Sequence, residues 1–380
     1  MKRAPRVWHV GGSDVNLRIP LLKRVREAGF EVAAVGTGNP DVFAAAGIEF
    51  FEYGLEPGMS PTADLRARGQ LARLLRGHQP AVVHAFDTKP SLLVPHAARS
   101  LPGVRCVRTI TGMGRAFSGT GVVWPVVRAV YRGAHRRVAR HCALTVFQNE
   151  DDQRYFTSHG MLGGGAHAVV RGSGVDVAGV RASAPAGERV RALRREIGAD
   201  QGALVLMVTR LVASKGVREF MRAAAEVRSS VSASFVLVGP IDETERSGKR
   251  LLREVEENPD VVYLGKRGDV PALLAAADVF ALPTYYPEGL PRVLLEAAVM
   301  GVPIVTTPVT GCREVVQHGS TGLVVEPRDA AALARAIRSL IDDPDSSRAL
   351  ATAAEEQVCR EFSLDRIASD YIAIYRDLVA

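Results

Sequence analysis

The chain has 380 residues, of which 47% are hydrophobic and 23% charged, and it carries a net charge of +7. This length exceeds one ordinary α/β domain and suits two, and the composition is that of a globular protein. We expect no secretory signal, because no long apolar stretch follows the basic N-terminus, and no membrane-spanning helix, because no apolar run approaches about 18 residues. Cys106, Cys142, Cys312 and Cys359 lie too far apart for a zinc motif and indicate the free thiols of a cytoplasmic protein.

The first half of the chain alternates apolar strands with helical stretches. Strands are predicted at 7–10, 30–35, 81–84, 105–109 and 144–147, with a helix around 19–25. This alternation is typical of a parallel, doubly wound sheet. Gly11 and Gly12 follow the first strand, where they either let a ligand approach the backbone or make a tight turn. The absence of a complete G-x-G-x-x-G or P-loop motif argues against a dinucleotide dehydrogenase or an NTPase.

Positive charge gathers in the first half. Residues 1–175 hold 23 Lys and Arg against 12 Asp and Glu, and no acidic residue occurs from 88 to 149. Within this stretch, segment 122–140 mixes arginines with Trp and Tyr at helical intervals, which predicts a basic amphipathic helix. Such a helix binds an anionic membrane surface. A solvated helix over the core is the alternative, and nucleic acid is disfavoured because no nucleic-acid-binding module is recognisable.

The second half of the chain starts a new α/β pattern. Segment 171–200 is rich in Gly, Ala and Ser and indicates a domain boundary, which we place between 175 and 176. Strands are predicted at 204–208, 234–238, 261–264, 279–282 and 303–306, with a helix from 216 to about 227. We expect a terminal helix at about 364–380 to pack back on the first domain. The predicted fold is α/β, with two Rossmann-like doubly wound domains facing across a ligand-binding cleft.

One stretch in the second half, PTYYPEGLPRVLLEA from Pro283, combines two acidic residues with a helix start. Pro291 suits the first turn of a helix, so Glu288 lies in the preceding loop and Glu296 within the helix. Their spacing of eight residues corresponds to about 12 Å along a helix, which is too far for an acid–base pair. The spacing suits two carboxylates that bind opposite ends of an elongated ligand. The free N–H groups of the helix N-terminus lie between them and can bind a phosphate.

This arrangement resembles the E-x7-E motif of family 4 glycosyltransferases with the GT-B fold. The resemblance covers the whole second half, through RLVASKG from 210, VGP from 238, GKRGDV from 265, AAVMGVPIV from 297, GCREVV from 311 and HGSTGLVV from 318. It implies a retaining enzyme without a cofactor or metal that moves a sugar from a nucleotide diphosphate, with UDP expected and GDP possible.

The resemblance also implies residue roles. Arg210 and Lys215 would neutralise the donor diphosphate, so that no divalent metal is required. Glu288 would bind the donor sugar and Glu296 the ribose, and Glu288, Arg210 and Lys215 form the implied catalytic set. The acceptor hydroxyl would attack on the face that the diphosphate leaves, and a phosphate oxygen would take its proton. The further implied donor contacts are Gly12, Thr111, Gly239, the backbone around Lys266 and Arg267, and the N–H groups of Gly289 and Leu290.

Segments of the first half, VVHAFDTKP, TITGMG, QNEDD and RGSGVD, resemble bacterial members that extend polyprenyl-diphosphate-linked sugars. By this resemblance, His84, Asp87 and Lys89 mark the acceptor side. Many relatives place an active-site His where this chain has Thr111, so the Thr111 hydroxyl and the Gly112 backbone are left as donor-sugar contacts. A soluble small-molecule acceptor is the alternative to a lipid-linked saccharide. Two other functions stay open: a sugar-nucleotide epimerase, and a protein that binds without catalysis.

Overall fold

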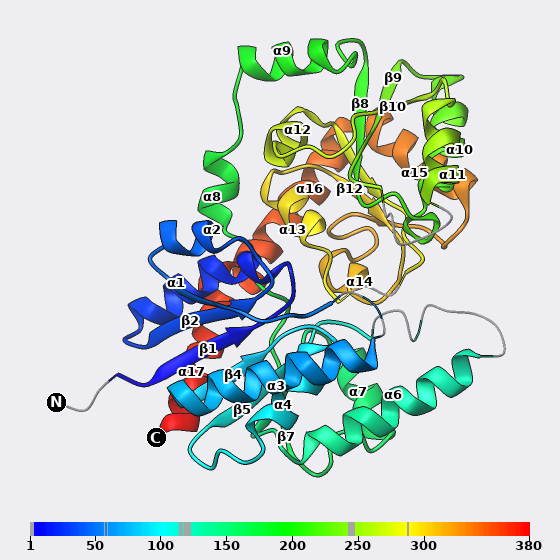
Figure 1. Cartoon of the computed structure of the whole chain (residues 1–380). Helices are drawn as coiled ribbons and strands as arrows, with labels where there is room; N and C mark the ends of the chain where they lie inside the picture. The colour runs from blue at the N-terminus through cyan, green and yellow to red at the C-terminus, as the bar shows by residue number, and fades with distance from the viewer. Residues whose placement is uncertain are drawn as a thin grey trace. The chain divides into compact units, whose positions relative to one another are not determined.

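The computed structural model describes residues 4–56, 58, 60–113, 117, 123–241, 248–286 and 289–380. Contacts divide the chain into two units, Met1–Gly174 with Leu364–Ala380, and Val175–Ser363 (Figure 1). The second unit starts and ends side by side, since the N–H of Val175 donates to the carbonyl of Phe362 at 2.9 Å. The boundary lies one residue before the one that the sequence predicts.

The described part of the first unit holds a seven-stranded sheet in the order β3-β2-β1-β4-β5-β6-β7, parallel throughout. Its strands are β1 (Arg6–Val10), β2 (Glu31–Gly36), β3 (Glu49–Glu52), β4 (Val82–Ala85), β5 (Arg105–Ile110), β6 (Leu144–Phe147) and β7 (Ala166–Val169). Its helices are η1 (Val15–Arg18), α1 (Ile19–Glu27), α2 (Pro40–Ala45), α3 (Pro61–His78), α4 (Pro90–Ala98), α6 (Trp124–Ala139), α7 (Glu150–Ser158) and α17 (Leu364–Val379).

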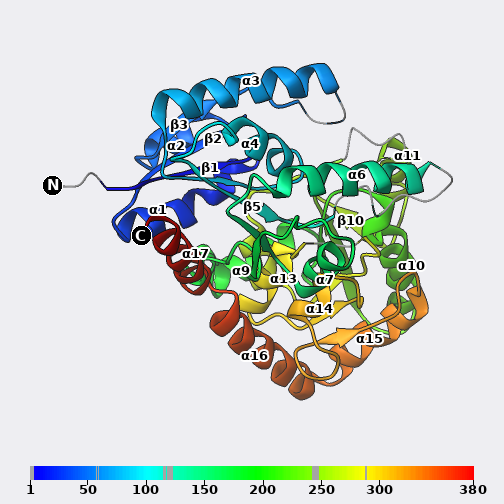
Figure 2. The ribbon, with the colours of Figure 1, turned by 90° about the horizontal axis from the view of Figure 1, so that it is seen from below.

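Each face of this sheet has its own core, because successive strand residues point to opposite faces. Trp8 and Val83 pack with side chains of α3 and α4, whereas Val7 and Val82 pack with side chains of α1 and α17. Figure 2 shows α3 and α4 on one face and α1 and α17 on the other. The last helix of the chain therefore completes the core of the first unit.

The described part of the second unit holds a six-stranded parallel sheet in the order β10-β9-β8-β11-β12-β13. Its strands are β8 (Ala203–Val208), β9 (Ala233–Val238), β10 (Val261–Tyr263), β11 (Val279–Leu282), β12 (Ile304–Thr306) and β13 (Leu323–Val324). Its helices are α8 (Val177–Ala182), α9 (Glu188–Glu196), η2 (Ala213–Lys215), α10 (Val217–Arg228), α11 (Gly248–Glu256), α12 (Val270–Ala276), α13 (Arg292–Val299), α14 (Cys312–Val315), α15 (Ala330–Asp342) and α16 (Pro344–Glu361).

The predicted α/β class with two parallel-sheet, Rossmann-like domains is confirmed. Segment 171–200 contains the boundary between the two units, and half of the segment folds into α8 and α9. The Arg and Glu residues of α9 favour helix, and Leu193 anchors that helix in the core. The structure leaves all four cysteines as free thiols. In the described residues, no helix combines the length and the apolarity that a membrane crossing requires.

Each sheet has one point where its strand order reverses, between β1 and β4 in the first unit and between β8 and β11 in the second. Doubly wound sheets bind ligands at the carboxyl ends of the strands that flank such a switch point. The fold therefore directs the search for a functional site to two places, the loops after β1 and β4 and the loops after β8 and β11.

Candidate active site

Two cations follow the carboxyl end of β8, at the switch point of the second sheet. Arg210 is exposed, whereas Lys215 ends η2 and is only 9% exposed. The Lys215 ammonium lies 5.3 Å from the centroid of the Tyr286 ring, so an aromatic face covers it on one side. This strand end is therefore suited to hold an anionic group.

Backbone packing joins the Lys215 turn to the loop after β11. Gly216 has a φ of +80°, and a Cβ there would lie 2.1 Å from the carbonyl oxygen of Pro283. The carbonyl of Ser214 accepts hydrogen bonds from the backbone N–H of Tyr285 at 2.9 Å and from the hydroxyl of Thr284 at 3.2 Å. These contacts fix the ammonium of Lys215 relative to the 283–286 backbone, and only glycine fits at 216.

The loop after β11 leads into α13, which begins at Arg292 with Pro291 as its N-cap. Gly289 and Leu290 are half-buried directly before this N-terminus, where backbone N–H groups lack helical partners. Glu288 lies outside the described residues. The structure thus places the predicted Gly289–Leu290 contact at the tip of a helix at the same switch point as Lys215.

Glu296 lies within α13, as predicted, and its side chain is 21% exposed. Burial raises the pKa of its carboxyl, while Arg292, with a nitrogen 3.9 Å from Oε1, lowers it. A partly desolvated carboxylate makes strong hydrogen bonds to hydroxyl donors. Glu296 is therefore able to bind a pair of neighbouring hydroxyl groups.

Two residues that were predicted to contact the donor, Gly239 and Arg267, make contacts with other parts of the protein. The N–H of Gly239 donates to the carbonyl of Gly265 at 2.8 Å, and a Cβ at 239 would lie 1.7 Å from the carbonyl oxygen of Thr209. Gly239 thus packs against the Thr209–Arg210 backbone and its N–H is used within the protein, so any contact with a donor would come from its other backbone atoms. The Arg267 guanidinium forms a two-point ion pair with Asp269 at 2.8 and 2.6 Å, while Lys266 is exposed. Because the guanidinium is paired, we expect Arg267 to contact the base of the donor nucleotide through its backbone, as the sequence analysis states.

In the first unit, Gly11 and Gly12 turn the chain at the carboxyl end of β1. The hydroxyl of Tyr53 donates to the carbonyl of Gly11 at 3.0 Å, and the N–H of Thr37 donates to the carbonyl of Gly12 at 3.4 Å. A Cβ on Gly12 would meet no atom closer than 3.7 Å. The protein alone therefore does not require glycine at position 12, which leaves open the close approach of a ligand.

A polar cluster occupies the same switch point at the end of β4. Asp87 adopts a φ of +71° and lies 3.4 Å from the Thr111 hydroxyl and 3.9 Å from the Arg18 guanidinium. Burial raises the pKa of the Asp87 carboxyl, Arg18 lowers it, and the hydrogen-bonded carboxyl of Asp14 raises it. The fold thus brings Asp87, predicted on the acceptor side, next to Thr111, predicted as a donor-sugar contact, and their carboxyl and hydroxyl groups can orient a polar substrate.

Arg18 was not predicted to be functional. Its buried guanidinium donates to the Ser173 hydroxyl at 2.6 Å and stacks over the Phe86 ring at 4.1 Å. The amide of Gln148 donates to the same hydroxyl at 3.2 Å. In the sequence, Arg18 is one more arginine before a helix, and no motif distinguishes it.

One of the three predicted acceptor residues needs correction. His84 is fully buried, with Nδ1 2.6 Å from the Tyr375 hydroxyl and Nε2 2.7 Å from the Thr109 hydroxyl. It joins β4 to α17 and is not accessible to an acceptor. The ammonium of Lys89 pairs with Asp64 at 2.7 Å and donates to the carbonyl of Glu56 at 2.9 Å, which ties α4 to the start of α3. The side chains of Asp87 and Lys89 are 28% and 24% exposed, so both stay candidates for the acceptor side.

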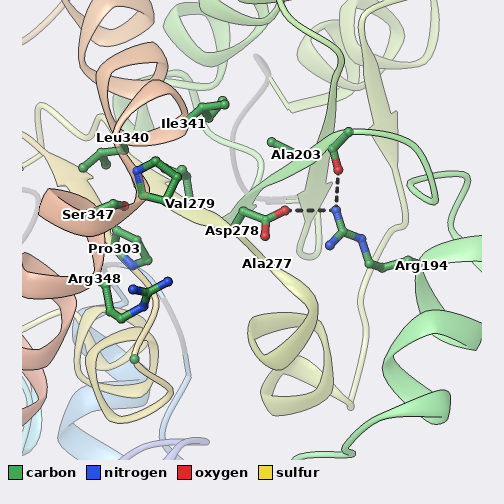
Figure 3. Close-up of a pocket in the computed structure, with 13 residues that line it drawn as sticks. Arg194, Ala203, Ala277, Asp278, Val279, Pro303, Leu340, Ile341, Ser347 and Arg348 are labelled. Atoms are coloured by element: carbon green, nitrogen blue, oxygen red, sulfur yellow. Dashed lines mark hydrogen bonds and ion pairs between the residues drawn. The ribbon is translucent and has the colours of Figure 1, made fainter.

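A pocket of about 480 Å³ in the second unit lies at the opposite edge of the sheet (Figure 3). Ala203 begins β8 and Val279 begins β11, so these lining residues mark the amino ends of the strands. The Arg194 guanidinium there pairs with Asp278 at 2.9 Å. Because doubly wound sheets bind nucleotides at their carboxyl ends, we do not assign the active site to this pocket. Within the described ranges, no three His, Cys, Asp or Glu side chains gather as a metal site.

Two family models match the chain, one in each half. The model of the family described as "Glycosyl transferase 4-like domain" matches residues 20–174, and that of "Glycosyl transferases group 1" matches residues 202–343. The second match contains the loops after β8 and β11, and the first contains Asp87 and Thr111. The switch point of the second unit therefore lies within the matched residues, as does the β4 side of the switch point of the first unit, whereas β1 and the loop after it precede the match.

Similar proteins cover nearly the whole chain. A Mycobacterium tuberculosis GDP-mannose-dependent alpha-(1-6)-phosphatidylinositol monomannoside mannosyltransferase is 30% identical over 320 residues, which are 81% of this chain and 78% of the relative. A Campylobacter jejuni N,N'-diacetylbacillosaminyl-diphospho-undecaprenol alpha-1,3-N-acetylgalactosaminyltransferase is 25% identical over 97% of this chain and 96% of its own. Anabaena HepE, solved in complex with UDP and glucose, has a TM-score of 0.81 at 18% identity and shares the fold over 98% of this chain and 100% of its own. The chain belongs to the family 4 glycosyltransferases with the GT-B fold and is a nucleotide-sugar-dependent glycosyltransferase.

Proposed function

We propose that the chain transfers a hexose or an N-acetylhexosamine from a UDP-sugar to a hydroxyl of a polyprenyl-diphosphate-linked saccharide, in cell-surface glycan assembly. The transfer would retain the anomeric configuration, need no metal, and take place on the cytoplasmic face of the cell membrane. The observation that supports the proposal is that Arg210 and Lys215 follow β8 and the N-terminus of α13 follows β11, the two strands that flank one switch point.

The donor half of the reaction follows from charge. A departing nucleoside diphosphate gains negative charge as the bond between the sugar and its oxygen breaks. Preorganised cations and backbone N–H groups stabilise that charge most where water is partly excluded, as it is around Lys215. Glu296 would hold the ribose hydroxyls, and Glu288 the donor sugar. The two cations would do the work that a divalent metal performs in other transferases.

The acceptor half draws on the first unit. We assign Asp87, with its partners Thr111 and Arg18, to the orientation of sugar hydroxyl groups at the end of β4. A phosphate oxygen of the departing diphosphate would take the proton of the attacking hydroxyl, on the same face of the sugar. The lipid-linked acceptor is supported by the Campylobacter jejuni relative, whose name includes a diphospho-undecaprenol acceptor, and by the TKP and ITGMG segments of this chain.

The test is a transfer assay on the full chain with UDP-glucose, UDP-GlcNAc, UDP-GalNAc and GDP-mannose, each with a polyprenyl-diphosphate disaccharide. We expect one UDP-sugar to be used, an α-linked product by NMR, and unchanged turnover in EDTA. An inverted linkage would refute retention, and a donor sugar altered without any acceptor would indicate an epimerase instead.

Lys215→Ala tests the catalytic assignment, with Lys249→Ala in α11 as the matched control because that lysine is exposed. The loss of one preorganised charge contact at a developing anion lowers kcat by roughly 100- to 1,000-fold. Normal turnover by a folded Lys215→Ala variant would rule out the role we give this residue.

A further inference from the structure

Helix α6 exposes an apolar stripe that the described residues of the first unit leave uncovered. Val126 and Val130 are 65% and 66% exposed, and Val123, just before the helix, is 62% exposed. Among the large hydrophobic side chains of the described ranges, Leu65 comes next at 56% and none matches the three valines. Positions 123, 126 and 130 recur at helical spacing, so these side chains share one face.

The same face becomes cationic toward the end of the helix. Arg137 and Arg140 continue the spacing of Val126 and Val130, and both arginines are exposed. Residues 88–149 contain no Asp or Glu that could neutralise them from within this stretch. One side of α6 is thus apolar in its first half and positively charged in its second half.

The other arginines of the helix are occupied by the protein. Arg132 donates to the Tyr155 hydroxyl at 2.9 Å, and Arg136 donates to the carbonyls of His159 at 2.8 Å and Gly160 at 3.1 Å. These two residues hold α6 against α7 and the turn that follows it. The sequence analysis treated segment 122–140 as one basic helix, whereas the structure separates the arginines that fasten it from those that face outward.

Neighbouring helices add positive charge near the C-terminal end of α6. Burial lowers the pKa of His96 in α4, and the charges of His141, Arg68, Arg99 and Arg137 lower it further. Arg68 belongs to α3 and Arg99 follows α4, so three helices bring their positive groups to one region. A surface of this sign and breadth attracts a polyanion more strongly than a single helix does.

We propose that this α6 face docks on an anionic bilayer, with Val123, Val126 and Val130 entering the edge of the hydrocarbon and Arg137 and Arg140 contacting lipid phosphates. The proposal deepens the proposed function by naming the partner surface, but it depends on no step of the transfer reaction. An interfacial helix combines an apolar part with Lys and Arg in this manner. A second copy of the chain fits less well, because either direction of α6 pairing would set arginines against arginines or against valines.

The fluorescence of Trp124 can report on the contact between α6 and lipid. The chain has two tryptophans, of which Trp8 is fully buried and stacked on Phe51, whereas Trp124 is in the first turn of α6 beside Val123. Quenching by lipids brominated on their acyl chains therefore reports on Trp124. We expect quenching with brominated phosphatidylglycerol vesicles at low salt, and none with vesicles of brominated phosphatidylcholine alone.

Vesicle sedimentation then measures the two halves of the face separately. Arg137→Gln with Arg140→Gln should weaken partitioning roughly 30-fold, at about 1 kcal/mol for each cation. Val126→Asn with Val130→Asn should weaken it roughly tenfold, since about half the apolar area of each valine is transferred. The matched control is Arg191→Gln with Arg195→Gln on α9, which removes the same charge from exposed positions and should leave partitioning within twofold.

Three results would overturn the docking proposal. The first is an absence of sedimentation of the unaltered chain with phosphatidylglycerol vesicles at low salt. The second is equal partitioning of the unaltered chain and both α6 variants. The third is a dimer, seen by light scattering, that Val126→Asn with Val130→Asn abolishes, together with no binding of the unaltered chain to vesicles. If the docking proposal fails, the use of the nucleotide sugar by the chain in solution should be unaffected. Failure of docking can therefore be distinguished from failure of the proposed transfer reaction.

Discussion

Acid is expected to destabilise the first unit, because its core holds histidines that are neutral in the folded state. Burial, assisted by the charge of Arg18, lowers the pKa of His9 to about 3. Burial also lowers the pKa values of His84 and His135 well below their usual value. His9 and His84 both contact the Tyr375 hydroxyl, at 2.9 and 2.6 Å, so these rings link the sheet to α17.

The sign and size of the effect follow from proton linkage. An unfolded histidine takes up a proton near pH 6.5, whereas the folded ring stays neutral until the pH falls to its lowered pKa. Between these two values, the unfolded state binds more protons, so the free energy of unfolding falls as the pH is lowered, by up to about 1.4 kcal/mol per pH unit for each histidine. At pH 5.5, three such histidines would remove about 4 kcal/mol, against a typical total of about 5–15 kcal/mol.

Urea unfolding followed by tryptophan fluorescence measures this, because Trp8 and Trp124 both belong to the first unit. Midpoints and slopes at pH 7.5, 6.5 and 5.5 give the dependence of the unfolding free energy on pH. His84→Asn should be less stable at pH 7.5, yet its free energy should vary less with pH, by up to about 1.4 kcal/mol per unit. His167→Asn, at an exposed position of β7, should keep the original dependence. An unchanged pH dependence in His84→Asn would refute the reasoning.

Three further substitutions test the candidate site. Gly216→Ala would force a Cβ to within 2.1 Å of the Pro283 carbonyl oxygen at a φ of +80°, so we expect a loss of more than about 1 kcal/mol in thermal unfolding; an unshifted Tm would show that the turn relaxes freely. Gly12→Ala meets nothing closer than 3.7 Å, so its Tm should stay the same while kcat/KM falls, and full activity would exclude a ligand from that loop. Glu296→Gln should raise the Kd of the nucleotide sugar in calorimetry at least about tenfold, through a lost charge-assisted hydrogen bond. Because burial raises the pKa of Glu296, the unaltered enzyme should also bind its donor more weakly as the pH falls through that raised pKa, and pH-independent binding would contradict the ribose contact.

The central strands were predictable because the interior of a parallel sheet buries both faces of each strand. Segments such as LVLMV in β8 are therefore continuous apolar runs, and residues 144–147 and 279–282 match β6 and β11 at both ends. The strands that the sequence analysis missed are β3, β7 and β13, which are short and only partly buried. Their residues, as in EFFE of β3, are too few and too polar for such a pattern to emerge.

His84 shows why a sequence pattern can misidentify a core residue as a binding residue. A polar residue at the end of an apolar strand is a reasonable site candidate, and Asp87 three residues later is exposed to solvent in part. The ring of His84 instead meets Tyr375, which lies 291 residues further along the chain. Nothing local to His84 indicates that α17 covers this face of the sheet, so only the assembled unit distinguishes a core histidine from a binding one.

The proposed donor and acceptor sides differ in how much of their geometry is local, and this explains why only the donor side has a motif of fixed spacing in the sequence. The loop after β11 and α13 form one continuous stretch, and backbone contacts as close as that of Gly216 with Pro283 restrict which residues the chain can use there. Such restrictions leave a motif of fixed spacing. The acceptor cluster instead draws Arg18, Asp87 and Thr111 from three separate strand ends, each free to change as long as the side chains still meet. A pattern of spacing therefore finds the helix tip that we propose as the phosphate site, whereas the groups that we propose to orient the acceptor emerge only once the sheet has been assembled.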